Sequence, residues 1–233
     1  MLKAQCSVHI DKDQRSGQRT TYNLQHRTWN MEHHRFIPYF WPMNIIGITG
    51  TLGAGKGTIV EFLVRNYGYR HFSVRGLVTE HILAQGLPVN RDSMVVVANG
   101  LRREHGPSIL VEILYDRAVE GQGDCVIESI RTPGEVMALR AKGKFTLFAV
   151  DAAPEVRYER IRDRASETDH ISFDTFLANE AREMDASDPS AQNLRACIAL
   201  ADHVFRNDGS IAALEKEVED VLHTLNATEK NNP

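Results

Sequence analysis

The sequence predicts an α/β fold in which helices cover both faces of a parallel β-sheet, giving three layers. Short apolar segments alternate with segments of helical periodicity between residues 44 and 225. The chain has 233 residues, of which 42% are hydrophobic and 25% charged, and this suits one α/β domain. Parallel strands require crossover connections, which the helical segments supply.

The first strand and the first helix are close neighbours in the sequence. Asn44–Thr49 is an apolar strand segment, and Gly57–Asn66 has the periodicity of a helix. The large apolar residues of this helix share one face, which we expect to be buried. They are Ile59, Val60, Phe62 and Leu63.

Three helices are expected between the second and third strands. The second strand is the short segment His71–Val74, and the helix Arg75–Gln85 ends where Gly86 and Pro88 interrupt helical geometry. The next two helices are separated by a Gly-Pro pair, which favours a break. They cover Arg91–His105 and Pro107–Glu120.

The second half of the domain continues the alternation. Cys125–Ile130 is an apolar strand, and Pro133 opens a helix because proline is preorganised for the first turn. The strand Lys144–Asp151 precedes the helix Pro154–Arg164, and further helices extend to about Ala201. The last elements are the strand His203–Arg206 and the amphipathic helix Ile211–Leu225.

Residues 1–43 differ from the rest and are expected to form a flexible leader or extension. They carry six Lys or Arg against three Asp or Glu, and they lack the apolar stretch of a secretory signal. An organelle transit peptide, or an upstream start before a natural beginning at Met43, is the alternative, and the four histidines of this segment are expected to be solvated. The domain should cover residues 44–226, with a lid at about 160–190 and a tail at 227–233.

Composition argues against several functional classes. The net charge of −4 disfavours a nucleic-acid partner, and no apolar run is long enough for a membrane span. Cys6, Cys125 and Cys197 lie too far apart for a zinc or disulfide pattern, which favours a reducing, cytoplasmic location. The oligomeric state stays open.

The glycine-rich turn after the first strand carries the strongest chemical signal. Such a turn lets backbone N–H groups point inward, and the helix N-terminus adds positive potential at the same place. Lys56 supplies a mobile charge for the β- and γ-phosphates of ATP. Strand, turn and helix follow in the order that a Walker A loop requires. The expected ATP-binding residues are Gly50, Thr51, Gly53, Ala54, Gly55, Lys56, Gly57 and Thr58.

Lys56-Gly57-Thr58 resembles the adenylate kinase branch of the P-loop kinases. Gly57 stands where Ser or Thr usually follows the lysine, so Thr58 is as well suited to an α-phosphate contact as to binding Mg²⁺. Glu128 lies near the end of the third strand, where such a kinase places its acid. We expect Glu128 to act in catalysis, either by holding Mg²⁺ through water or by orienting the acceptor, and the alternative is a surface glutamate.

The stretch 127–136 resembles the Ile-Asp-Gly-Ile-Arg-Ser-Pro-Glu-Glu-Val segment of dephospho-CoA-kinase-like P-loop proteins, with Glu128 replacing Asp. Stretches 101–107, 149–161 and 201–210 extend this resemblance along nearly all of residues 44–225. The chain therefore resembles the P-loop nucleotide kinase superfamily, nearest to dephospho-CoA kinase-like and nucleoside monophosphate kinase-like proteins. The resemblance implies a five-stranded sheet in the order 2-3-1-4-5, a short helical lid, and an adenine-binding loop that includes Asn207 and Gly209. By its own chemistry, that loop is a turn and a helix N-cap.

Arginines are the residues expected to hold the transferring and acceptor phosphates. Arg131 is the candidate for the acceptor phosphate, and one of Arg102 and Arg103 should join it while the other faces solvent; we favour Arg103. Arg160 and Arg164 share a helix face and resemble the lid arginines that close over ATP, although surface salt bridges would also explain them.

The segment Ser73–Thr79 departs from the Ser-Thr-Gly-Asp-x-x-Arg acceptor motif of adenylate kinases. Gly76 replaces the aspartate, Thr79 replaces the arginine, and Arg75 enters where glycine is usual. The Asp-Ala-Asp of standard dephospho-CoA kinases is also missing. Arg75 is therefore expected to bind the acceptor, and AMP is not assumed as the acceptor.

Together these features predict an ATP- and Mg²⁺-dependent phosphotransferase. Its acceptor would be a small phosphorylated molecule, either a (deoxy)nucleoside monophosphate or a dephospho-CoA-like nucleotide. Two alternatives remain open, namely a regulatory P-loop ATPase and an ATP-binding module without kinase activity.

Overall fold

A five-stranded parallel sheet organises the protein in the computed structural model, which describes residues 43–164 and 171–230 and, of these, the side chains up to residue 227. The strands lie in the order β2-β3-β1-β4-β5, which confirms the order expected from the resemblance. The described residues belong to one unit. The strands are β1 (Ile45–Gly50), β2 (Arg70–Ser73), β3 (Cys125–Glu128), β4 (Phe145–Asp151) and β5 (His203–Arg206).

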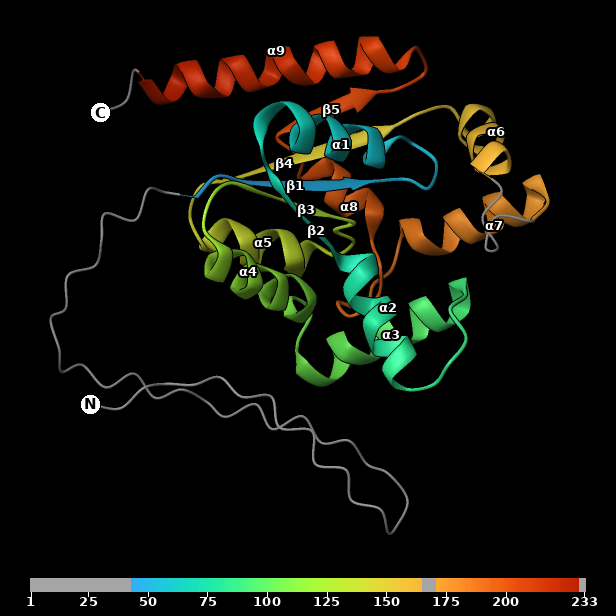
Figure 1. Cartoon of the computed structure of the whole chain (residues 1–233). Coiled ribbons are helices and arrows are strands. Elements are labelled where there is room, and N and C mark those ends of the chain that lie inside the picture. The colour runs from blue at the N-terminus through green and yellow to red at the C-terminus, as the bar shows by residue number, and fades with distance from the viewer. Residues whose placement is uncertain (1–42, 165–170, 231–233) are drawn as a thin grey trace, which may run out of the picture. The chain divides into compact units, whose positions relative to one another are not determined.

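Helices cover both faces of this sheet, as predicted (Figure 1). The helices α1 and α9 bury their apolar residues against one face, together with alternate residues of β1, β3 and β4. The helices α2, α3, α4, α5 and α8 contribute to the core on the other face. The helices of the described residues are α1 (Lys56–Tyr67), α2 (Val74–Ala84), α3 (Arg91–His105), α4 (Ile109–Gly121), α5 (Pro133–Ala141), α6 (Pro154–Arg164), α7 (Phe173–Met184), α8 (Leu194–Ala199) and α9 (Ile211–Lys230).

Local sequence explains where several helices begin. Thr132 and Glu135 form a capping box at the start of α5, with proline in its first turn. Asn90 and Ser93 form a second capping box at α3. These side chains satisfy backbone N–H groups that have no partner inside the helix, so they fix the entry points of two helices near the carboxyl edge of the sheet.

The structure differs from the sequence-based expectations at a few element ends. The strand β3 stops at Glu128 rather than Ile130 because Ser129 has a φ of 71°, which is incompatible with extended backbone. The helix α4 starts at Ile109, two residues after the expected Pro107, and α9 continues past Leu225 to Lys230. The buried face of α1 consists of the four predicted residues.

The carboxyl ends of β1, β3 and β4 meet at one edge of the sheet because all three strands run in the same direction. Ile48 pairs with both Glu128 and Phe148, so the turn after β1, Glu128 and Asp151 come close together. The helices α6 and α7 lie at this edge (Figure 1). None of the described helices is long and apolar enough to cross a membrane. The predictions for residues 1–42 and 231–233 lie outside the described residues, as does the lid segment 165–170.

Candidate functional site

The turn between β1 and α1 has the backbone geometry of a phosphate cradle. Gly50, Gly53 and Gly55 all have positive φ, at 138°, 79° and 105°. A Cβ at Gly53 would lie 2.6 Å from the carbonyl oxygen of Arg157, so a side chain there would force the backbone to move. Glycine at this position therefore lets the turn adopt positive φ and approach the backbone of α6 closely.

Lys56 folds back over this turn. Its Nζ donates hydrogen bonds to the carbonyl oxygens of Gly50 and Thr51, at 2.9 and 2.7 Å. The pKa of Lys56 is lowered from 10.5 to about 7, chiefly by burial of the ammonium group and then by the charge of Arg131, while Glu128 and Glu183 act in the opposite direction. The lysine that was expected to meet the triphosphate is thus held by neutral carbonyl groups.

Residues distant in sequence support the turn from behind. The buried Asn207 donates from Nδ2 to the carbonyl oxygen of Ala54 at 2.8 Å, and Arg160 donates to the carbonyl oxygen of Asn207 at 2.9 Å. Thr51 donates from Oγ1 to Asp151 at 2.6 Å. The structure therefore places Asn207 and Arg160 beside the turn, whereas Gly209 is exposed on the loop that follows β5.

Arg157, which the sequence analysis left without a role, connects α6 to the turn and to α7. Its guanidinium group is buried, donates to the carbonyl oxygen of Leu52 at 3.3 Å and forms an ion pair with Glu180 of α7. It also lies over the ring of Phe176. A buried arginine of this kind needs an acceptor for each N–H face, so the position of α7 depends on Glu180.

Glu128 lies at the end of β3 and is partly buried. Its Oε2 lies 3.0 Å from Nε2 of His71, and its Oε1 accepts a hydrogen bond from Ser129 at 3.2 Å. Burial raises the pKa of Glu128, but the hydrogen bond from His71 and the charge of Lys56 outweigh burial, so the pKa lies below its ordinary value. Glu128 is therefore an ionised carboxylate at the edge of the turn, and this suits the predicted role near Mg²⁺.

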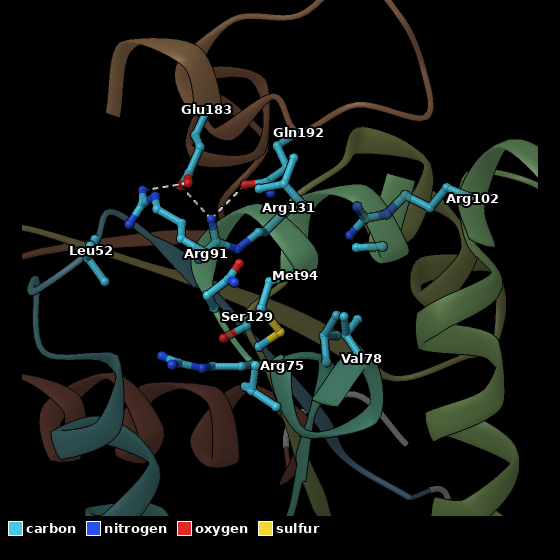
Figure 2. A pocket seen from close by; sticks show the side chains of 15 residues that line it. Leu52, Arg75, Val78, Arg91, Met94, Arg102, Ser129, Arg131, Glu183 and Gln192 are labelled. Carbon is cyan, nitrogen blue, oxygen red and sulfur yellow. Dashed lines mark hydrogen bonds and ion pairs between the residues drawn. The ribbon is translucent and has the colours of Figure 1, made fainter. Parts of the chain in front are cut away.

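A second group of charged and polar side chains lies near the turn. Arg131 donates from Nη1 to Glu183 and to Gln192, both at 2.6 Å. Arg91, at the start of α3, donates to the other oxygen of Glu183 at 2.5 Å. Figure 2 shows Glu183 joined to both guanidinium groups. Arg131 was predicted, but Arg91, Glu183 and Gln192 were not.

This charged group borders a cavity between the turn, α2 and α3 (Figure 2). The cavity has an empty volume of about 740 Å³, part of which is open to solvent. Leu52 and Ser129 also line it, so the cavity adjoins the turn. Its apolar wall consists of Val74, Val78, Val89, Met94, Val95 and Ala98.

The remaining predicted arginines occupy three different environments. Arg75 lines the cavity. Of the neighbouring pair on α3, Arg102 lines the cavity and is buried, whereas Arg103 is exposed and is not among the lining residues. Arg164 is exposed at the end of α6, next to the segment 165–170 that the structure does not describe. Thr58 is partly buried in the first turn of α1.

Comparisons with known proteins agree with this fold. Residues 46–186 match the family described as an AAA domain. A UPF0200 protein from Methanococcus vannielii is 31% identical over 189 residues, which cover 79% of this chain and 94% of the relative. A UPF0200 protein from Methanococcus maripaludis is 30% identical, with 81% of this chain and 97% of the relative covered.

Solved structures share the fold at lower identity. A gluconokinase from Sinorhizobium meliloti has a TM-score of 0.52 at 14% identity, covering 82% of this chain and 98% of that chain. TT1252 from Thermus thermophilus has a TM-score of 0.53 at 22% identity, covering 79% and 98%. At these identities the likeness extends to the fold alone, which is that of the P-loop kinases.

Proposed function

From the premise that the chain belongs to the UPF0200 family and has an AAA domain, we propose that it transfers the terminal phosphoryl group of ATP to a small phosphorylated acceptor. The acceptor would be a (deoxy)nucleoside monophosphate or a dephospho-CoA-like nucleotide. The proposal depends chiefly on one observation, namely that a cavity lined by Arg75, Arg91 and Arg131 adjoins the glycine-rich turn. A P-loop protein that only hydrolyses ATP does not need a second basic site beside the cradle.

The turn binds the ATP phosphates through main-chain N–H groups and the N-terminus of α1. Lys56 leaves the carbonyl oxygens of Gly50 and Thr51 and neutralises phosphate charge. Arg160 lies close enough to the turn to assist, and Arg164 extends the same helix toward the lid. Asn207 supports the turn rather than contacting the nucleotide with its side chain.

The acceptor phosphate binds on the other side of the turn. Arg131 reaches the space between the turn and the cavity, and Arg75 borders it from α2. Planar guanidinium groups suit this role because they donate two parallel hydrogen bonds to phosphate oxygens. Arg103 points to solvent in the free protein, so it would join the acceptor site only after α3 moves.

Glu128 is the residue that would hold Mg²⁺, through water or directly. It is ionised, the charge of Lys56 helps to lower its pKa, and it lies where β3 ends beside the turn. When bound, the ion would offset the charge of the phosphate oxygens. The protein's own residues supply position and charge, and little covalent chemistry is required of them.

The test is a coupled ADP-release screen over nucleoside monophosphates, deoxynucleoside monophosphates and dephospho-CoA. ADP release should rise with one of these acceptors, and Lys56→Ala should abolish it without unfolding the protein. Lys216→Ala is the matched control because Lys216 lies on the exposed face of α9, and it should keep full turnover. Undiminished turnover in Lys56→Ala would contradict the assignment of the site.

A regulatory ATPase or a binding module without kinase activity is the second candidate. The observation that favours it is the altered Ser73–Thr79 segment, in which Gly76 leaves α2 without the expected carboxylate. A regulatory ATPase would release ADP at a rate that no acceptor changes. A binding module would bind ATP and release no ADP.

A further inference from the structure

Glu183 occupies an unusual position for a surface-helix glutamate. It comes from α7, yet its carboxylate lies between Arg91 of α3 and Arg131 after β3, with one oxygen at 2.5 Å from Arg91 and the other at 2.6 Å from Arg131. The three side chains expose only 10%, 24% and 22% of their surface, in the order Glu183, Arg91 and Arg131. A single carboxylate thus fills a two-arginine anion site that borders the cavity.

We propose that Glu183 is an internal occupant of the acceptor's anion site, and that the acceptor is a phosphate ester which binds by displacing it. This inference rests on the proposed function and identifies the residues that would hold the acceptor's phosphate. Arg91 and Arg131 then form the site that recognises the acceptor's phosphate. Glu183 keeps both guanidinium groups paired while no acceptor is present.

The chemistry of the two guanidinium groups favours a phosphate over a carboxylate or a neutral ligand. A phosphate monoester carries up to two negative charges and three acceptor oxygens, so it can satisfy both arginines more fully than one carboxylate. A neutral alcohol cannot displace Glu183, because the two arginines would then lose their counter-charge in a half-buried site. The internal glutamate therefore acts as a filter for anionic acceptors.

The rest of the cavity describes the body of this acceptor. Its wall on the α2 and α3 side is aliphatic, and none of the lining residues that the structure describes is aromatic. An acceptor body would be held by apolar contact with Val78 and Met94 rather than by ring stacking. Among the polar lining residues that Figure 2 labels, Arg91, Arg131, Glu183 and Gln192 lie together, and Arg102 lies apart from them.

Release of Glu183 need not detach α7 from the domain. Glu180, one turn earlier, forms a separate ion pair with the buried Arg157. Phe176 is buried beneath the same helix. Replacing the Glu183 carboxylate by an amide should therefore free the anion site while α7 stays in place, and an unchanged circular dichroism spectrum would show that the variant keeps its helix content.

The test is a calorimetric titration of inorganic phosphate into the full chain, saturated with Mg²⁺ and AMP-PNP so that the turn is filled. Glu183→Gln should bind phosphate about tenfold more tightly than wild type, because the internal competitor is gone. Glu80→Gln is the matched control: it removes the same charge from an exposed pair with Arg117 and should change nothing. Equal affinity in Glu183→Gln and wild type would overturn the proposal.

Two further variants make the test specific. The double variant Arg91→Gln/Glu183→Gln should lose the gain, and retention of the full gain would exclude Arg91 from the site. Glu183→Asp keeps the charge but withdraws it by one methylene, so it should bind phosphate more tightly than wild type and less tightly than Glu183→Gln. Its comparison with wild type tests the proposal even if the amide variant does not fold. Acetate should bind Glu183→Gln more weakly than phosphate does, and equally tight binding would overturn the assignment to phosphate esters.

Failure of this inference can be told apart from failure of the proposed function. If the chain binds no AMP-PNP or shows no ADP release, the same phosphate titrations are repeated in the Lys56→Ala background, in which the turn lacks its ammonium group. The gain from Glu183→Gln is still expected there. Loss of the gain in that background would place the phosphate on the turn and overturn the assignment of Arg91 and Arg131.

Discussion

Lys56 should take up a proton when ATP binds, and this can be measured directly. In the free protein its pKa is lowered to about 7, chiefly by burial, and its Nζ donates to two carbonyl oxygens. A neutral amine still has two N–H donors, which is what those two contacts need. A triphosphate placed against Lys56 favours the charged form and raises its pKa again.

The size of the effect follows from the two protonation states. At pH 8 a group with a pKa near 7 is about 90% neutral, so binding should take up roughly 0.9 proton, and at pH 6 only about 0.1. Because the folded pKa lies below the ordinary 10.5, the unfolded chain binds more protons between those values. This group's effect on stability therefore becomes more favourable as the pH rises from about 7 toward 10.5.

The assay is calorimetric titration of Mg²⁺–AMP-PNP in two buffers that differ in ionisation enthalpy, at pH 6 and pH 8. The difference between the two apparent enthalpies gives the number of protons taken up. Lys56→Arg is the control, because a guanidinium group stays charged in both states and should show almost no uptake. An uptake at pH 8 below about 0.3 proton, or the same uptake in Lys56→Arg, would refute a neutral Lys56 in the free protein.

Three further predictions concern a buried ion pair, the glycine-rich turn and the buried thiols. Arg102→Met should lower the free energy of unfolding by about 3–5 kcal/mol in urea titrations, because it leaves the buried Glu135 without its cation. The same change at the exposed Arg103 should alter the free energy of unfolding by no more than about 0.5 kcal/mol. Gly53→Ala should lower the free energy of unfolding by more than about 1 kcal/mol and weaken AMP-PNP binding, since φ is 79° and the added Cβ meets a backbone carbonyl. Gly57→Ala should preserve stability, because a Cβ added there meets no atom within 4 Å. In a Cys6→Ser variant, Ellman's reagent at pH 8 should modify neither buried thiol until denaturant is added, because burial raises the pKa of each to about 12; modification of either thiol in the folded protein would contradict this.

Sequence alone was enough to predict the elements of the sheet and the cradle. The strands β1, β3 and β4 are short and mainly apolar, so their length and lack of helical periodicity could distinguish them from helices. The cradle is local, since Gly50, Gly55 and Lys56 lie within seven positions of one another. Local patterns of this kind are fixed by backbone geometry that does not depend on distant partners.

Contacts between distant elements could not be predicted in the same way. Glu183 meets residues 92 and 52 positions away, and neither α7 nor α3 carries a pattern that brings them together. The choice between Arg102 and Arg103 was equally hidden, because it depends on which side of α3 packs against α5 and Glu135. The resembling proteins have glycine at the position of Ser129. The sequence shows this difference, but it does not show that Ser129 has a φ of 71°.

The contrast between two arginine–glutamate contacts separates binding groups from structural ones. Glu135 is fully buried: one oxygen accepts from two nitrogens of Arg102, and the other accepts from the backbone N–H groups of Arg131 and Thr132. Every acceptor position there has a fixed local partner, so a ligand could enter only by unfolding the start of α5. Glu183 instead reaches its arginines from a separate helix at the border of a cavity, and a ligand oxygen can replace each of its contacts. Lys56 resembles Arg91 and Arg131 in this respect, because its Nζ donates to two carbonyl oxygens that a ligand oxygen can replace. If phosphates bind as proposed, they replace the partners of Arg91, Arg131 and Lys56, whereas Glu135 remains paired with Arg102.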